Sequence, residues 1–120
     1  MALSSGDEIV LLCNPRCSKS RAAHALLVER GVEFRERRYL EEPLGLEELT
    51  DLQGRLALEP AAFVRKGEAA FADEGLASDA SPEALLSAVA KHPILLERPI
   101  LVRGARAIVG RPPERVLELL

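Results

Sequence analysis

A cysteine in a short polar loop is the residue of this chain whose setting best suits chemistry. The loop Asn14-Pro15-Arg16-Cys17 follows the apolar run Ile9–Leu12 and precedes a segment with helical spacing that begins at Ser18. A strand, a tight turn and a helix start would place Cys17 at the first turn of the helix, where backbone N–H groups are unpaired. A thiolate is an anion, so we predict a lowered pKa and a nucleophilic role for Cys17.

Neighbouring residues could serve the same chemistry. Arg16, Lys19 and Arg21 add positive charge within a few residues, and the N–H groups at a helix start could also hold a tetrahedral oxyanion. Asn14 could bond across the loop through its side chain or act as a turn former. The alternative for a cysteine that ends a buried strand is a packing role, which fits Cys13 better than Cys17.

The elements that would carry this loop form a β-α-β unit. We predict a strand over residues 8–13, a helix over 18–30 that stops at Gly31, and a second strand from Phe34 to Tyr39. Such a unit implies two parallel strands joined by a right-handed crossover.

From Leu46 to Leu96 the apolar residues recur at helical spacing. We predict a short helix that closes near Gly54 and turns three leucines to one face, namely Leu46, Leu49 and Leu52. Two further short helices are predicted, over residues 60–65 and 68–73. Ser81-Pro82-Glu83 predicts another helix start, with a serine cap and a proline at the first helical position, and His92-Pro93 ends that helix.

Two strands and a helix complete the predicted fold. Residues 100–103 and 106–110 are typical of a hairpin around the turn Gly104-Ala105. Arg111-Pro112-Pro113 opens a last helix that is expected to turn three residues inward, namely Val116, Leu117 and Leu120. The alternation of strands and helices predicts an α/β protein.

The composition is that of an ordinary globular protein and excludes several function classes. With 120 residues, 48% of them hydrophobic and 29% charged, the chain is expected to form a single domain over residues 1–120. A net charge of −3 and 3% aromatic residues argue against direct binding of nucleic acid. No apolar run approaches the roughly 20 residues of a membrane span, and the N-terminus lacks the pattern of a signal peptide. We therefore expect a cytoplasmic protein without membrane association.

The cysteines and histidines do not predict a metal site. The chain has two of each, and they lack the spacing of zinc ligands. We therefore expect no bound metal or other bound cofactor. We also expect a monomer.

Four segments resemble the glutaredoxin-coupled arsenate reductase family, which is built on a thioredoxin fold. In chain order they are Asn14–Arg21, Val64–Lys66, His92–Ile100 and Gly110–Pro112. The resemblance covers residues 9–120 and implies a thioredoxin-like fold, βαβ…ββα, with a helical insertion between the second and third strands at roughly residues 43–97. It also implies a cis peptide bond at Pro99, which would face the active-site cysteine.

The resemblance implies a chemistry for particular residues. Cys17 matches the nucleophile that attacks arsenate, and three arginines match those that bind the oxyanion, namely Arg65, Arg98 and Arg111. Guanidinium groups suit this role, because each can bind two oxygens of an anion and favours the thiolate. Glutathione, as the reducing co-substrate, would attack the cysteine–arsenic adduct, and glutaredoxin would resolve the mixed disulfide. The remaining substrate-binding residues would be Asn14, Ser18, Lys19, Ser20, Arg21 and Pro99.

One position departs from the family pattern. Many arsenate reductases have a histidine four residues before the nucleophile, where this chain has Cys13. A histidine there could hold positive charge near the thiolate, and a cysteine cannot. The substitution also makes Cys13 a candidate redox partner that would form a disulfide with Cys17.

Two other functions stay open. One is a regulator of the Spx type, since those proteins share this fold and contact RNA polymerase. They carry a second cysteine three residues after the first, and Ser20 occupies that position here, which favours the enzyme. The other is a family paralogue that reduces a different thiol-linked substrate.

Overall fold

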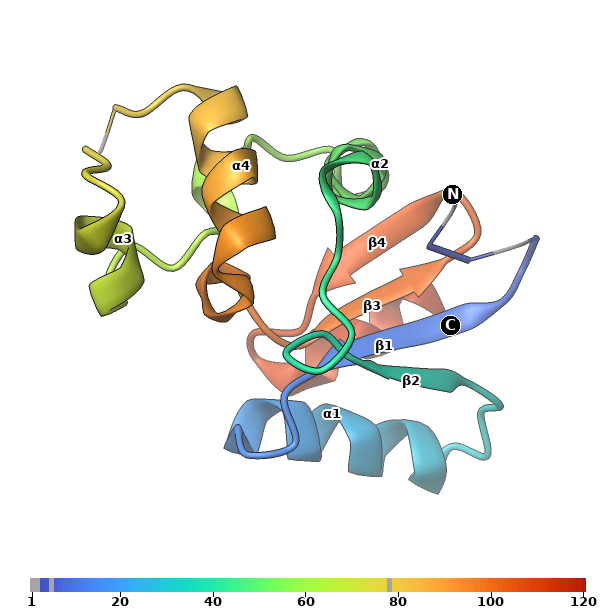
Figure 1. Ribbon diagram of the computed structural model, residues 1–120. Helices are drawn as coiled ribbons and strands as arrows, with labels where there is room; N and C mark the ends of the chain where they lie inside the picture. Colours follow the sequence, from blue (N-terminus) through green and yellow to red (C-terminus); the bar gives the residue numbers. More distant parts are fainter. Residues whose placement is uncertain (1–2, 5, 78) are drawn as a thin grey trace.

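The protein is built around a four-stranded sheet with helices on both faces, as the computed structural model shows for residues 3–4, 6–77 and 79–120 (Figure 1). The strands are β1 (Ile9–Cys13), β2 (Arg35–Arg38), β3 (Ile100–Arg103) and β4 (Arg106–Val109). Their order in the sheet is β2-β1-β3-β4. Strand β1 is parallel to β2 and antiparallel to β3, and β3 is antiparallel to β4. The predicted thioredoxin-like α/β fold is confirmed.

The helices divide into one crossover, one insertion and one C-terminal segment. Helix α1 (Ser18–Glu29) connects β1 to β2, and a 3-10 helix, η3 (Pro113–Leu119), follows β4. The insertion between β2 and β3 contains α2 (Leu46–Leu56), η1 (Pro60–Ala62), α3 (Ala69–Asp73), α4 (Pro82–Lys91) and η2 (Pro93–Leu95). These helices fall inside the predicted limits of 43–97. Within the described ranges, no helix combines the length and apolar character that crossing a bilayer requires.

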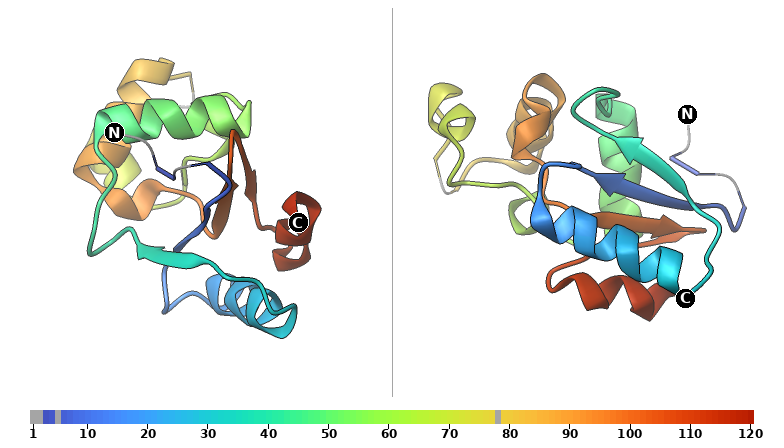
Figure 2. Two further views of the ribbon diagram at one scale, coloured as in Figure 1. Left: turned by 90° about the vertical axis from the view of Figure 1, so that its right-hand side faces the viewer. Right: turned by 90° about the horizontal axis from the view of Figure 1, so that it is seen from below.

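The two faces of the sheet bury separate clusters of side chains. Helices α2 and α4 lie on one side of the sheet, whereas α1 and η3 lie on the other (Figure 2). Alternation along β1 divides its side chains accordingly: Leu12 packs with the insertion, and Leu11 and Cys13 pack with α1. The loop after β1 therefore starts at the boundary between the two halves of the core.

Several predicted helix ends are confirmed by local geometry. The Ser81 hydroxyl accepts a hydrogen bond from the Ala84 N–H at 3.2 Å, which caps the start of α4. Gly31, just past α1, has φ +67°, in the left-handed region that favours glycine.

One detail of the predicted α2 is wrong. Leu46, the first residue of α2, is 50% exposed, while Leu49 and Leu52 are fully buried. The helix ends at Leu56, near the predicted end at Gly54, and Leu56 still packs into the core.

The C-terminal helix also differs from the prediction. Leu120 is 43% exposed rather than inward-facing, whereas Val116 and Leu119 are buried. A 3-10 helix has three residues per turn, so residues three apart share a face. The prediction from α-helical spacing that Leu120 faces inward is therefore wrong, and Leu119 is buried in its place.

Close packing surrounds Pro99, the proline that precedes β3. The Arg98–Pro99 peptide bond is cis, as the resemblance implies, and Arg111–Pro112 is cis as well. The Gly110 N–H donates a hydrogen bond to the Pro99 carbonyl oxygen at 2.8 Å. A Cβ atom on Gly110 would lie 2.8 Å from Val116 Cγ1 and 2.9 Å from Pro99 Cγ. The glycine therefore lets η3 pack directly against Pro99.

We predict that Gly110→Ala destabilises the protein by about 1–3 kcal/mol, because the added methyl overfills this contact. Gly54→Ala is the matched control. A Cβ at Gly54 meets nothing within 4 Å and lies in a helix, so this change should stabilise by about 0.5–1 kcal/mol. Urea unfolding of both variants tests the prediction, and equal stability of Gly110→Ala and wild type would contradict it.

Candidate active site

The strand pairing brings separate parts of the chain together at one end of the sheet. Cys13 of β1 pairs with Arg38 of β2, and Leu12 of β1 pairs with Ile100 of β3. Strand β3 pairs with β4 in the same way, since Ile100 lies opposite Val109. When the three pairings are extended beyond the strand ends, four residues fall in one row across the sheet, namely Tyr39, Asn14, Arg98 and Arg111. This row borders the loop that carries Cys17.

Hydrogen bonds within the loop fix its shape. The Cys17 N–H donates to the Asn14 carbonyl oxygen at 2.9 Å, and the Arg16 N–H donates to Asn14 Oδ1 at 3.0 Å. The buried Ser20 hydroxyl accepts from the Asn14 N–H at 3.1 Å. Asn14 thus bonds across the loop and forms its turn at the same time, and Cys17 is held as the residue that caps α1.

The surroundings of Cys17 favour its thiolate. Burial raises the pKa of this thiol, but hydrogen bonds from the N–H groups of Ser20 and Lys19 and from the side chains of Arg98 and Arg111 outweigh burial. The resulting pKa is about 7, against 9.0 for an ordinary cysteine. A larger share of the molecules would therefore carry the thiolate at neutral pH than for an ordinary cysteine. The predicted lowering of the Cys17 pKa is borne out.

Arg98 and Arg111 are held beside one another through a shared carboxylate. Arg111 Nε donates to the Arg98 carbonyl oxygen at 2.9 Å and lies 3.3 Å from Glu97 Oε1. The same Glu97 oxygen accepts a hydrogen bond from the Arg98 N–H at 3.1 Å. Glu97 therefore offsets part of the repulsion between two cations that lie next to the sulfur.

Arg65 belongs to the insertion, and its backbone pairs with the segment that leads into Glu97 and Arg98. Val64 and Leu96 form an antiparallel bridge, and the Arg65 N–H donates to the Leu95 carbonyl oxygen at 2.7 Å. Its Nη2 lies 3.8 Å from a carboxylate oxygen of Glu68. Arg65 therefore lies opposite Leu95, which is two residues before Glu97 in the chain.

Several buried donors near these arginines have no acceptor within the described part of the chain. They are Arg65 Nη1, Arg98 Nε and Arg98 Nη1. Native proteins leave few buried polar atoms unpaired, and arginine nitrogens can only donate. The unpaired donors of Arg98, which also stabilises the Cys17 thiolate, indicate a site for an anion.

The other predicted substrate-binding residues fall into different roles. Lys19 and Ser20 contribute their backbone N–H groups to Cys17, and the Ser18 and Lys19 side chains are exposed. The Arg21 guanidinium donates to the Pro15 carbonyl oxygen at 3.1 Å, so it braces the loop. Pro99 is buried against Gly110.

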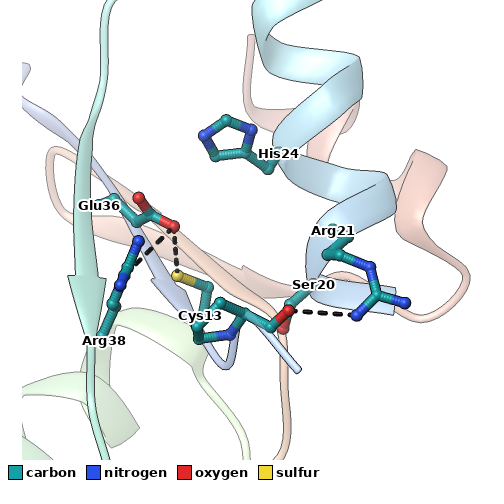
Figure 3. Close-up of a pocket in the computed structure, with 7 residues that line it drawn as sticks. Cys13, Ser20, Arg21, His24, Glu36 and Arg38 are labelled. Atoms are coloured by element: carbon teal, nitrogen blue, oxygen red, sulfur yellow. Dashed lines mark hydrogen bonds and ion pairs between the residues drawn. The ribbon is translucent and has the colours of Figure 1, made fainter. Parts of the chain in front are cut away.

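Cys13 faces a separate pocket on the α1 side of the sheet. This pocket of about 340 Å³ is lined by Cys13, Pro15, Ser20, Arg21, His24, Glu36 and Arg38 (Figure 3). The Cys13 thiol donates to Glu36 Oε1 at 3.2 Å, and burial together with this carboxylate raises the pKa of Cys13 to about 12. Both cysteines are free thiols in the structure, and the disulfide between them stays a prediction.

Sequence patterns alone missed two residues of this site. Glu97 lies inside a segment singled out for its arginine and proline, but nothing local marks it as the partner of Arg111. The sequence pattern predicts Tyr39 only as the end of a strand. Its position after β2, which is parallel to β1, was the available signal, because parallel strands gather functional side chains at their carboxyl ends.

We predict that alkylation of Cys17 by iodoacetamide rises with pH around a midpoint near 7, because the thiolate is the reacting form. Arg98→Ala and Arg111→Ala should each move this midpoint to higher pH, since each removes a group that stabilises the anion. Mass spectrometry after timed labelling measures the rate. Cys17→Ser is the control and should remain unlabelled, because Cys13 is buried with a pKa of about 12. A midpoint near 9 for Cys17 would contradict the prediction.

Comparison with known proteins identifies the family. Residues 12–119 match the ArsC family. Arsenate reductase of Neisseria meningitidis serogroup A is 44% identical over 115 residues, which covers 94% of this chain and 98% of that protein. The uncharacterized protein YfgD of Escherichia coli K12 is 43% identical over 115 residues, covering 94% and 97% respectively.

A solved structure agrees with these sequence matches. The structure of arsenate reductase from Vibrio cholerae superposes with a TM-score of 0.90 at 42% identity, and covers 97% of this chain and all of that one. Because the matches in sequence and structure span nearly the whole chain, this protein belongs to the ArsC family.

Proposed function

We propose that this protein is an arsenate reductase in which the Cys17 thiolate attacks an oxyanion held by Arg65, Arg98 and Arg111. The observation that carries the proposal is a cysteine of pKa about 7 whose thiolate receives hydrogen bonds from two arginines. The unpaired buried nitrogens of Arg65 and Arg98 add to its support. Relatives that are named arsenate reductases, at 44% and 42% identity, support the choice of arsenate as substrate.

The first step follows from charge and geometry. Arsenate carries two negative charges near neutral pH, so guanidinium groups both bind it and reduce its repulsion of the thiolate. The sulfur attacks arsenic, a sulfur–arsenic bond forms, and one arsenate oxygen takes up protons and leaves as water. The arginines stabilise the charge on the remaining oxygens of the adduct.

Reduction requires a second thiol. In our proposal glutathione, as co-substrate, attacks the Cys17 sulfur of the adduct, which releases arsenite and leaves a mixed disulfide between Cys17 and glutathione. Two electrons pass from the two sulfurs to arsenic in this step. Glutaredoxin then takes the glutathione by thiol–disulfide exchange and restores the Cys17 thiolate. We propose that this cycle runs on a cytoplasmic monomer without a bound cofactor.

The position that would hold the second cysteine of a thiol-switch regulator has a structural role in this chain. The Ser20 hydroxyl accepts from the Asn14 N–H and is buried, so this residue closes the loop rather than presenting a reactive group. This favours the enzyme over an Spx-type regulator that binds RNA polymerase. A paralogue acting on another thiol-linked substrate would retain the nucleophile and differ in the substrate that it reduces.

We predict arsenate-dependent consumption of NADPH when the protein is assayed with glutathione, glutaredoxin and glutathione reductase. Cys17→Ser should abolish this activity, because no other thiol of the chain has a lowered pKa. Absence of turnover in wild type, together with retention on immobilised RNA polymerase, would reject the enzyme in favour of the regulator.

Arg98→Ala and Arg111→Ala should each lower kcat/KM for arsenate by about 10²–10³, the usual effect of removing one anion-stabilising donor. Arg106→Ala is the matched control, because Arg106 is exposed and begins β4 at the opposite end of the sheet. A comparable loss of activity in Arg106→Ala would show that general positive charge, rather than the site, is responsible.

A further inference from the structure

The lone tyrosine of the chain is a buried residue with an unpaired hydroxyl. Tyr39 is fully buried, and its ring packs with the insertion against Leu44, Val89 and Leu96. Its hydroxyl oxygen has no hydrogen-bond partner in the part of the chain that the structure describes. A buried hydroxyl without a partner lowers stability, so we expect this one to bond to a group outside the chain, either a ligand or a water molecule.

Tyr39 belongs to the same row of residues as the arginine site. It follows β2 directly, opposite Asn14 by continuation of the strand pairing, and Arg98 lies on the other side of Asn14. Burial raises the pKa of Tyr39 above its ordinary value, while the positive charge of Arg98 opposes that rise and the charge of Cys17 adds to it. The hydroxyl is therefore protonated at neutral pH and lies within electrostatic reach of both groups.

The unpaired atoms of the site cannot all satisfy one another. Arginine nitrogens have no acceptor capacity, so Arg65 and Arg98 cannot bond to each other. The Tyr39 oxygen could accept from a guanidinium, but its own proton would still need an acceptor. A tetrahedral oxyanion offers several acceptor oxygens and negative charge, so it can accept from the guanidinium groups and from the Tyr39 hydroxyl at once.

We propose that the Tyr39 hydroxyl donates a hydrogen bond to the oxyanion bound by the three arginines, and is thus a further substrate-binding residue. This inference rests on the proposed function, because it concerns the same anion. It assigns Tyr39 to the bound ligand and not to the sulfur, since the hydrogen bonds to Cys17 come from backbone N–H groups and arginines.

Tyr39→Phe tests the proposal, because it removes the hydroxyl and keeps the buried ring. Arsenate affinity is measured by isothermal titration calorimetry in a Cys17→Ser parent, where binding occurs without reaction. We expect Tyr39→Phe to weaken arsenate binding about 10- to 100-fold, as expected for one hydrogen bond to a charged group. In the protein with Cys17 intact, KM for arsenate should rise.

Two further measurements separate a binding role from a structural one. The stability of Tyr39→Phe in urea should equal or exceed that of its parent, because the lost hydroxyl has no partner within the protein. The alkylation midpoint of Cys17 should stay near 7. Phe71→Leu, a trimmed aromatic ring in α3, is the control that should lower stability and leave arsenate affinity unchanged.

Each outcome is decisive. Equal arsenate affinity of Tyr39→Phe and its parent overturns this inference alone, as does a raised alkylation midpoint, which would assign the hydroxyl to the sulfur. Loss of stability without loss of affinity would show a structural hydroxyl and also overturns it. A parent protein that binds no arsenate overturns the proposed function and this inference together.

Discussion

The attraction between one sulfur anion and the donors around it is the interaction on which this structure depends. Some of these donors are local, because the N–H groups of Lys19 and Ser20 belong to the first turn of α1. The others come from beyond the insertion, since Arg98 precedes β3 and Arg111 follows β4. The sheet order β2-β1-β3-β4 is therefore a condition of the chemistry, because it sets β3 beside the strand that leads into the Cys17 loop.

Gathering cations in this way lowers stability, and the fold offsets only part of the loss. Glu97 accepts from the Arg98 backbone and pairs with Arg111, which reduces the repulsion between neighbouring guanidinium groups. Arg65 and Arg98 still keep buried nitrogens without acceptors, and each such group costs about 1–3 kcal/mol. An oxyanion bound as proposed would accept hydrogen bonds from these nitrogens and offset this cost.

Local sequence patterns predicted the parts of the molecule that local physics determines. The strand, polar loop and helix around Cys17 follow from hydrophobic spacing and from the cost of unpaired N–H groups, and the thiolate follows from them. Spacing gave no information on Arg98 and Arg111, which only a family resemblance connected to Cys17, because their contact depends on the register between strands distant in sequence. The prediction that Leu120 faces inward is wrong for a local reason, because η3 has three residues per turn instead of the α-helical period that was assumed.

The two cysteines show how far reactivity depends on neighbours from other strands. Cys13 and Cys17 lie four residues apart, yet burial and Glu36 of β2 raise the pKa of one to about 12, while arginines and N–H groups lower the pKa of the other to about 7. Cys13 also occupies the position where many arsenate reductases have a histidine. In this chain that position faces Glu36 and α1, and the groups that ionise Cys17 lie elsewhere. The absence of a histidine therefore leaves the main source of the thiolate intact.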